Sequence, residues 1–151
     1  MASLQPPAAA PHAAVRVSVG VDLVDVARIA RLAAQPAGLA GVLTERELSD
    51  CRSRPRPAEH IAARFAAKEA VLKAFGTGLA QGIRWTDVEI RTAPSGRPVV
   101  ELHGRAAALA AGEGLHAVDV SLSHTAQLAI AHAAATWADA CAAPQRPTAP
   151  R

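Results

Sequence analysis

The chain has few of the residues that build a disulfide framework, an aromatic surface or a metal cluster. Its 151 residues include two cysteines, two tryptophans, two phenylalanines, one methionine and no tyrosine. Cys51 and Cys141 show no CxxC or Cys/His ligand spacing, so we expect two free thiols in a reducing compartment. The sparse aromatics also argue against nucleic-acid binding by the basic loop at residues 52–57, which has nothing beside it to stack on bases.

Long apolar runs are missing as well. No window reaches the ~18–20 apolar residues of a membrane span. The opening residues carry neither the basic part nor the apolar part of a signal peptide. We therefore expect a cytoplasmic protein without a membrane segment.

What is present indicates one mixed domain with a real core. Half of the residues are hydrophobic, and much of that half is alanine, which favours helices and fine packing. The net charge of +3 suits an acidic protein partner or a phosphate-bearing ligand.

The centre of the chain is the stretch Arg64–Gly78, with the sequence RFAAKEAVLKAFGTG. On a helical period, Ile61, Phe65, Leu72 and Phe75 share one apolar face, and Lys68 lies within it. A lysine there is costly unless its amine reaches water or meets an anion.

Glu69 and Lys73 are four residues apart at the edge of that face, so both can project into one space, although such pairs are commonly only solvated. Gly76, Thr77 and Gly78 then end the helix with a turn that a ligand could approach closely.

The N-terminal region supplies a possible partner for this helix. Val15–Val21 has the pattern of a strand and runs into Asp22, which is either a metal ligand or a turn residue. Asp25 is placed to cap a helix that continues to about Ala34. Further on, Thr44 and Glu47 have the capping-box spacing, and Pro57 is suited to open the long helix.

The order of the remaining elements predicts an α+β fold, with one long helix packed on an antiparallel sheet. We expect a hairpin from strands at 85–91 and 97–103, a helix at 104–112, and final strands at 115–123 and 127–135. The domain is expected at residues 15–136, between a disordered N-terminal tail at 1–14 and a flexible C-terminal tail at 137–151.

Three segments in this order resemble the signatures of holo-[acyl-carrier-protein] synthases. Residues 19–29 (VGVDLVDVARI) resemble the first, a strand that ends in G-x-D-x-x-(D/E)-x-x-R. Residues 65–78 (FAAKEAVLKAFGTG) match the second closely, and residues 121–125 (SLSHT) resemble the third, S-x-S-H-(T/D). The resemblance spans about 15–135.

The resemblance implies the 4′-phosphopantetheinyl transferase fold and reaction. Such enzymes move phosphopantetheine from coenzyme A to a serine of an apo acyl carrier protein, commonly in fatty-acid synthesis, and release adenosine 3′,5′-bisphosphate. Short chains of this type resemble homotrimers with active sites at subunit interfaces. The resemblance implies the following site residues: Asp22 and Glu69 for Mg²⁺, Lys68 and Lys73 for the phosphates, Gly76, Thr77, Gly78, Ser123 and His124 for coenzyme A, and Arg28 with Arg31 for the carrier protein.

Several points stay open at the level of sequence. Thr125 stands where some members have an aspartate, and the serine proton could go to a magnesium-bound water or to Glu69. Two other functions use the same residues: a metal-dependent hydrolase of coenzyme A or nucleotide pyrophosphates, and a non-catalytic module that binds coenzyme A or an acidic protein.

Overall fold

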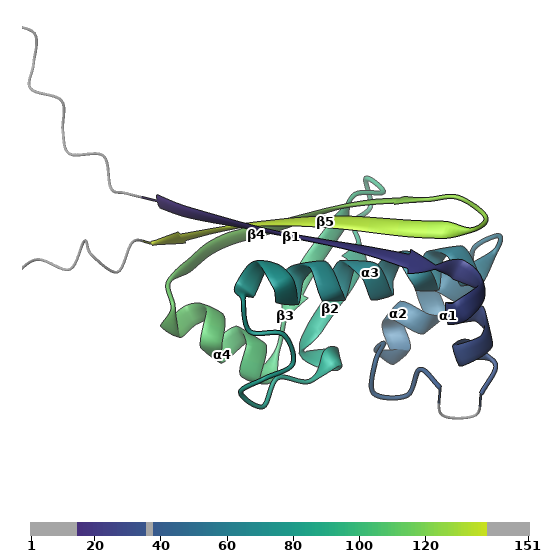
Figure 1. Cartoon of the computed structure of the whole chain (residues 1–151), viewed down its shortest axis with the longest axis horizontal. Helices are drawn as coiled ribbons and strands as arrows, with labels where there is room; N and C mark the ends of the chain where they lie inside the picture. Colours follow the sequence, from purple (N-terminus) through teal and green to yellow (C-terminus); the bar gives the residue numbers. More distant parts are fainter. Residues whose placement is uncertain (1–14, 36–37, 139–151) are drawn as a thin grey trace, which may run out of the picture.

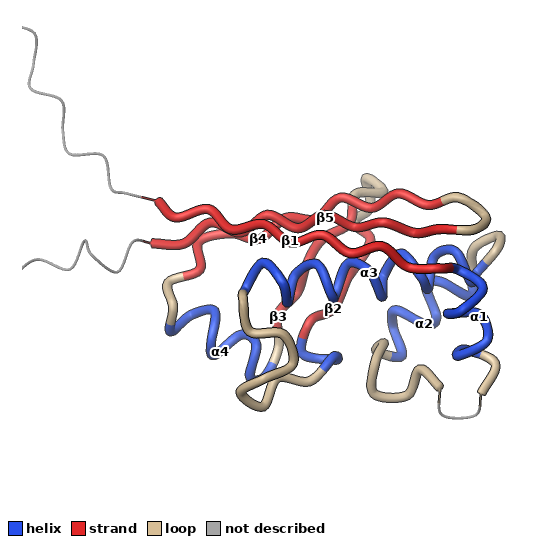
Figure 2. The backbone as a smooth tube through the Cα atoms, in the orientation of Figure 1, coloured by secondary structure: helices blue, strands red, loops and turns tan. Residues whose placement is uncertain are grey.

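The computed structural model describes residues 15–35 and 38–138. A three-stranded antiparallel sheet forms one layer, and the long helix α3 (Pro57–Phe75) lies directly against one of its faces (Figures 1 and 2). This arrangement is the α+β fold that the sequence predicts. The expected tails at 1–14 and from 139 onward lie outside the described residues.

The sheet has the strand order β1-β5-β4, so that the first strand pairs with the last. These strands are β1 (Val15–Asp25), β4 (Leu115–His124) and β5 (Leu128–Ala138). In the register, Asp22 lies opposite Ala131 and His124 lies opposite Ala129. The middle strand β5 thus places the first and third sequence signatures on the two edge strands.

Alanines on both surfaces let α3 lie close to the sheet. Every second residue of β5 points toward the helix, and the alanines among them are at most 1 % exposed: Ala129, Ala131, Ala133 and Ala135. The facing helix carries a fully buried alanine at Ala66 and another at Ala70. Small side chains on both sides bring the two backbones together, which a core of large side chains would prevent.

Two short helices precede α3 and have the predicted caps. Asp25 accepts a hydrogen bond from the Arg28 N–H and begins α1 (Val26–Ala33). Thr44 and Glu47 form the expected capping box at the start of α2 (Glu45–Arg52). Both local predictions are confirmed, because caps depend on neighbouring residues only.

The second sheet is a hairpin of β2 (Val88–Thr92) and β3 (Pro98–Leu102), followed by α4 (Gly104–Gly112). The expected strand from residue 85 begins three residues late, because Trp85–Asp87 forms the 3-10 turn η1. Arg84 explains this turn: its N–H and its guanidinium both bond the Asp87 carboxylate. The alternating sequence pattern does not reveal these hydrogen bonds between Arg84 and Asp87.

The strands of the first sheet are longer than predicted. β1 continues past Asp22 to Asp25, and β5 continues to Ala138, two residues beyond the expected end of the domain. Trp137 accounts for the extension of β5, because it is fully buried, packs edge-on against Phe75 and donates its indole N–H to Ser18. Burial of one large aromatic side chain outweighs the Pro/Ala-rich composition of the sequence that follows it.

The sheet face away from α3 is apolar and exposed. In β1, side chains that are 54–63 % exposed occupy every second position: Val15, Val17, Val19, Val21 and Leu23. Leu128 and Ile130 of β5 continue this outer face at 44 % and 43 % exposure. Within the described residues, no helix is long and apolar enough to cross a membrane.

Candidate active site

Asp22, Glu69 and Lys73 converge where β1 crosses α3. The Lys73 ammonium donates to Asp22 Oδ1 at 2.7 Å and to the Val21 carbonyl at 3.0 Å. Glu69 lies one turn before Lys73 and close enough to Asp22 for the two carboxylates to repel each other. Residues about fifty positions apart in the chain therefore share one small polar site. The four-residue spacing of Glu69 and Lys73 on α3 predicts that these two side chains project into one space.

Gly20 is the residue that lets β1 come this close to the helix. A Cβ at this position would lie 2.7 Å from the Ala74 backbone nitrogen and closer still to the Ala70 carbonyl oxygen. Two residues further along the same strand face, Asp22 is carried to the edge of α3. The glycine of the first signature thus has a steric reason that the sequence alone does not state.

The electrostatics of this site suit a divalent cation. Burial first, and then the nearby charge of Asp22, raise the pKa of Glu69 above its ordinary value, and the charge of Lys73 opposes them. Two carboxylates that repel each other in a half-buried place are stabilised by a cation between them. Mg²⁺ prefers such hard oxygen ligands and completes its shell with water and phosphate oxygens, so the donor set fits this ion.

Lys68 lies outside the site formed by Asp22, Glu69 and Lys73. Its side chain is fully buried, and its ammonium bonds Glu47 Oε2 at 2.7 Å, the Val88 carbonyl at 2.6 Å and the Trp85 carbonyl at 3.1 Å. These three acceptors match the three donors of an ammonium group. A lysine in the apolar face needs an anion, as the sequence predicts, but this anion is Glu47, so Lys68 is not part of the proposed ligand site.

The turn after α3 ends the helix as the glycines predict. Gly76 has φ 74° and donates its N–H to the Lys73 carbonyl, and the Gly78 N–H reaches the Leu72 carbonyl at 3.4 Å. Both N–H groups are thus engaged in closing the helix. Thr77 between them is half-buried, and the glycine surfaces on either side are exposed next to Lys73.

His124 lies in a second polar site, which is a cavity of about 180 Å³ between α3, β4 and the β2–β3 hairpin. Its Nδ1 is 3.0 Å from Glu59, and its ring stands edge-on to His60. The cavity is lined by several basic side chains: Arg54, His60, Arg64 and His124. Burial first, and then the charges of His124, Arg54 and Arg64, lower the pKa of His60, which shows how closely positive groups gather here.

Sequence reasoning missed His60 and Arg64 as members of this cavity. The sequence does contain a signal for them. His60 and Arg64 are four residues apart on α3, so they share a face of the helix, and they lie just before the second signature. Ser123 is exposed, and together with His124 it lines a second, apolar recess that reaches Leu23 of β1.

The Asp22 site and the His124 cavity lie at opposite edges of the sheet. Asp22 belongs to the edge strand β1 and His124 to the edge strand β4, with β5 between them. Neighbouring strands are about 4.8 Å apart, so two strand spacings separate the residues in the sheet direction alone. The described chain does not bring His124 to the side chains of Asp22, Glu69 and Lys73.

Arg28 and Arg31 are exposed on α1, immediately after Asp25. Their i,i+3 spacing puts them on one side of the helix, and α1 follows directly from the strand that carries Asp22. A basic surface therefore lies on the helix that follows the strand of Asp22.

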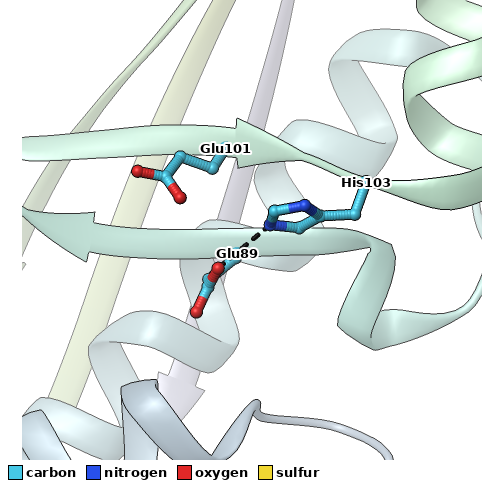
Figure 3. A group of neighbouring side chains, drawn as sticks. All are labelled: Glu89, Glu101 and His103. Carbon is cyan, nitrogen blue, oxygen red and sulfur yellow. Dashed lines mark hydrogen bonds and ion pairs between the residues drawn. The ribbon is translucent and has the colours of Figure 1, made fainter.

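A third group of ionisable side chains lies on the hairpin (Figure 3). Ligand atoms of Glu89, Glu101 and His103 are within 4.8 Å of one another. Glu89 already bonds Thr44 at 2.8 Å and His103 at 3.0 Å, while Glu101 pairs with an arginine on β2. Internal partners thus account for these side chains, and none of them belongs to the Asp22 site.

Comparisons with known proteins show the family of this chain. A sequence model of the 4′-phosphopantetheinyl transferase superfamily matches residues 18–133. The chain is 48 % identical to the holo-[acyl-carrier-protein] synthase of Desulforudis audaxviator over 79 % of this chain and 92 % of that protein. It is 43 % identical to the synthase of Koribacter versatilis over 76 % of this chain and 94 % of that protein.

A solved structure gives the same result for the fold. The holo-(acyl-carrier-protein) synthase of Bacillus anthracis, in complex with coenzyme A (3′,5′-ADP), is similar at a TM-score of 0.68 and 29 % identity. The match covers 83 % of this chain and 100 % of that chain. The chain therefore belongs to the 4′-phosphopantetheinyl transferase superfamily and, within it, to the enzymes of the holo-[acyl-carrier-protein] synthase type.

Proposed function

We propose that this enzyme transfers the 4′-phosphopantetheine group of coenzyme A to a serine of an apo acyl carrier protein. The observation that carries the proposal is the convergence of Asp22, Glu69 and Lys73 beneath β1. In the reaction, the serine hydroxyl gives up its proton to a water or to Glu69, its oxygen forms a bond to a pyrophosphate phosphorus, the bridging P–O bond breaks, and adenosine 3′,5′-bisphosphate leaves. Such a transfer depends on positioning and on neutralising negative charge.

The residues of the site have separate tasks. Asp22 and Glu69 hold Mg²⁺, which when bound neutralises charge on the pyrophosphate oxygens. Lys73 is half exposed, on an unbranched chain, and can donate to a phosphate oxygen beside the two carboxylates. Gly76, Thr77 and Gly78 border this place and allow the ligand to lie against the end of α3.

The basic cavity at His124 suits the nucleotide end of coenzyme A, which carries phosphate groups. His60, Arg64 and Arg54 lie around His124 there, and Ser123 precedes His124 on the same strand. Arg54 and Arg64 supply cationic donors there, and charge-assisted hydrogen bonds to an anion are stronger than neutral ones. This site extends the role that the third signature predicts for His124.

The Asp22 site and the His124 cavity can bind one ligand together if they belong to two copies of this chain. The exposed apolar face of the sheet, with five side chains of β1 at 54–63 % exposure, is of the kind that self-association covers. We therefore include in the proposal a homotrimer in which the Asp22 edge of one copy meets the His124 edge of the next. Association would bury the apolar face and complete the site in one step.

Arg28 and Arg31 form the docking surface for the carrier protein. They lie on the helix that follows the strand of Asp22 and can pair with acidic residues of the partner, which orients the acceptor serine toward the pyrophosphate. We place the enzyme in the cytoplasm and, as the common setting of the family, in fatty-acid synthesis.

Intact-mass measurement of an apo acyl carrier protein tests the proposal. The carrier is incubated with the full chain, coenzyme A and Mg²⁺, and we expect a gain of one phosphopantetheine mass that EDTA abolishes. A folded protein that adds no mass to any of several carriers would contradict transferase activity. Release of adenosine 3′,5′-bisphosphate without a carrier would instead identify a hydrolase.

A charge reversal separates docking from chemistry. Arg28→Glu should raise the carrier concentration needed for half-maximal rate by about tenfold or more while leaving coenzyme A affinity unchanged, because a rim charge acts on its partner alone. The matched control is Arg52→Glu, an exposed arginine at the end of α2. Equal losses in the two variants would show that only net charge matters.

A further inference from the structure

Lys73 already occupies one oxygen of the Asp22 carboxylate, which the proposed function assigns to the metal ion. Lys73 donates to Asp22 Oδ1 at 2.7 Å and is held in place by a second bond, at 3.0 Å, to the Val21 carbonyl. Asp22 is the more buried partner, with a side chain that is 16 % exposed against 49 % for Lys73. A cation that takes Oδ1 as a ligand lies about 2.1 Å from it, inside the position of the ammonium.

Displacement of Lys73 requires a new partner for it. Its side chain is long, unbranched and half exposed, so it can leave Asp22 without disturbing the core. The pyrophosphate of coenzyme A, in the function proposed above, supplies the replacement anion. A metal ion that arrives with pyrophosphate therefore brings a new anion for the displaced ammonium, whereas a metal ion alone leaves the ammonium without its carboxylate.

We propose that Lys73 couples metal entry to coenzyme A entry: it occupies Asp22 until pyrophosphate draws it away, so that the two ligands bind cooperatively. This inference deepens the proposed function and depends on its placing of both ligands. It assigns to Lys73 a positioning role toward the metal in addition to its contact with phosphate. Coupling between ligands is reciprocal, so coenzyme A and the metal each strengthen the binding of the other.

The test measures binding and needs no turnover. Mn²⁺ replaces Mg²⁺ as a probe, and the free ion is counted by electron paramagnetic resonance with the full chain, first alone and then with coenzyme A. Lys73→Met should bind Mn²⁺ about two- to fivefold more tightly than the wild type without coenzyme A, since an exposed ion pair no longer competes. The gain in Mn²⁺ affinity on adding coenzyme A should be smaller in Lys73→Met.

Two controls make the result specific. Arg97→Gln removes a positive charge from an exposed pair, with Asp119, and should leave Mn²⁺ affinity unchanged. Adding Asp22→Asn to Lys73→Met should abolish the tighter binding. Unchanged or weaker Mn²⁺ binding by Lys73→Met alone, or a gain that survives Asp22→Asn, would overturn the proposal.

The outcomes also separate this inference from the proposed function. Tighter Mn²⁺ binding by Lys73→Met supports competition at Asp22 even if no carrier protein is modified. If the wild type transfers phosphopantetheine but Lys73→Met binds Mn²⁺ no more tightly, the proposed reaction is supported and the competition between Lys73 and the metal is refuted.

Discussion

The α carbon of Gly20 faces the carbonyl oxygen of Ala70 without room for a side chain between them. A Cβ on Gly20 would also lie 2.7 Å from the Ala74 nitrogen. This close approach of β1 to α3 is what places Asp22, two residues along the strand, beside Glu69 and Lys73. The proposed chemistry thus depends on a packing contact.

Gly20→Ala should unfold more easily, by about 2 kcal/mol or more, because backbone atoms cannot yield as a flexible side chain does. Urea titration of the full chain measures this loss. The control is Gly112→Ala, where an added Cβ meets nothing within 4 Å. Since alanine favours helices over glycine, that change should be neutral or stabilising by up to about 1 kcal/mol. Similar losses in the two variants would contradict the steric account.

Glu69→Gln should separate activity from stability. Loss of a metal-binding charge should lower the transfer rate by about 100-fold or more. The same change removes the repulsion between Glu69 and Asp22, so the melting temperature should stay the same or rise. Rate assays and thermal unfolding measure both quantities, and Glu113→Gln, an exposed carboxylate at the end of α4, is the control. A fully active Glu69→Gln protein would refute the metal assignment.

Lys68→Met should cost about 3–5 kcal/mol of stability, because it leaves Glu47 buried without its partner. The double change with Glu47→Gln should recover part of this loss, since no unpaired charge remains. Chemical denaturation measures both variants. The folded double variant should bind coenzyme A as the wild type does in calorimetry. A clear loss of affinity there would restore Lys68 to the ligand site.

Glu89 should make the protein sensitive to acid. Burial by itself would raise its pKa, but hydrogen bonds from Thr44 and His103 and the charge of Arg46 outweigh burial and hold the pKa below its ordinary value of 4.5. The folded state then binds this proton less readily than the unfolded chain. The stabilisation is therefore present above about pH 4.5 and is lost as the pH falls below that value.

Glu89→Gln tests this dependence. Its free energy of unfolding should fall less than that of the wild type between about pH 6 and about pH 3.5, because the amide does not titrate in this range. Urea titrations at several pH values give the comparison. Parallel pH profiles for the two proteins would show that other carboxyls carry the acid sensitivity.

Val17→Asp should prevent the proposed self-association, because a charge within the exposed apolar row of β1 is costly to bury. Size-exclusion chromatography with light scattering measures the oligomeric state. Leu79→Asp provides the control, since Leu79 is 44 % exposed on the loop after α3, away from the sheet. A monomeric wild type, or a trimer that survives Val17→Asp, would contradict the interface.

The sequence by itself determined the features that depend on neighbouring residues or on one helix. The caps at Asp25 and Thr44, the proline that opens α3 and the glycine that ends it are all local, and the structure has them where they were predicted. The i,i+4 spacing of Glu69 and Lys73 likewise follows from helical geometry. The resemblance of three ordered segments supplied the family.

Only the tertiary structure decided which of two similar lysines faces the site. Lys68 and Lys73 lie on one helix, but the capping glutamate of α2 takes the first and the carboxylate of β1 takes the second. It also placed Asp22 and His124 on opposite edges of one sheet, because β5 pairs between their strands. Strand order and long-range ion pairs join residues distant in the chain, and neither periodicity nor spacing within a segment contains that information.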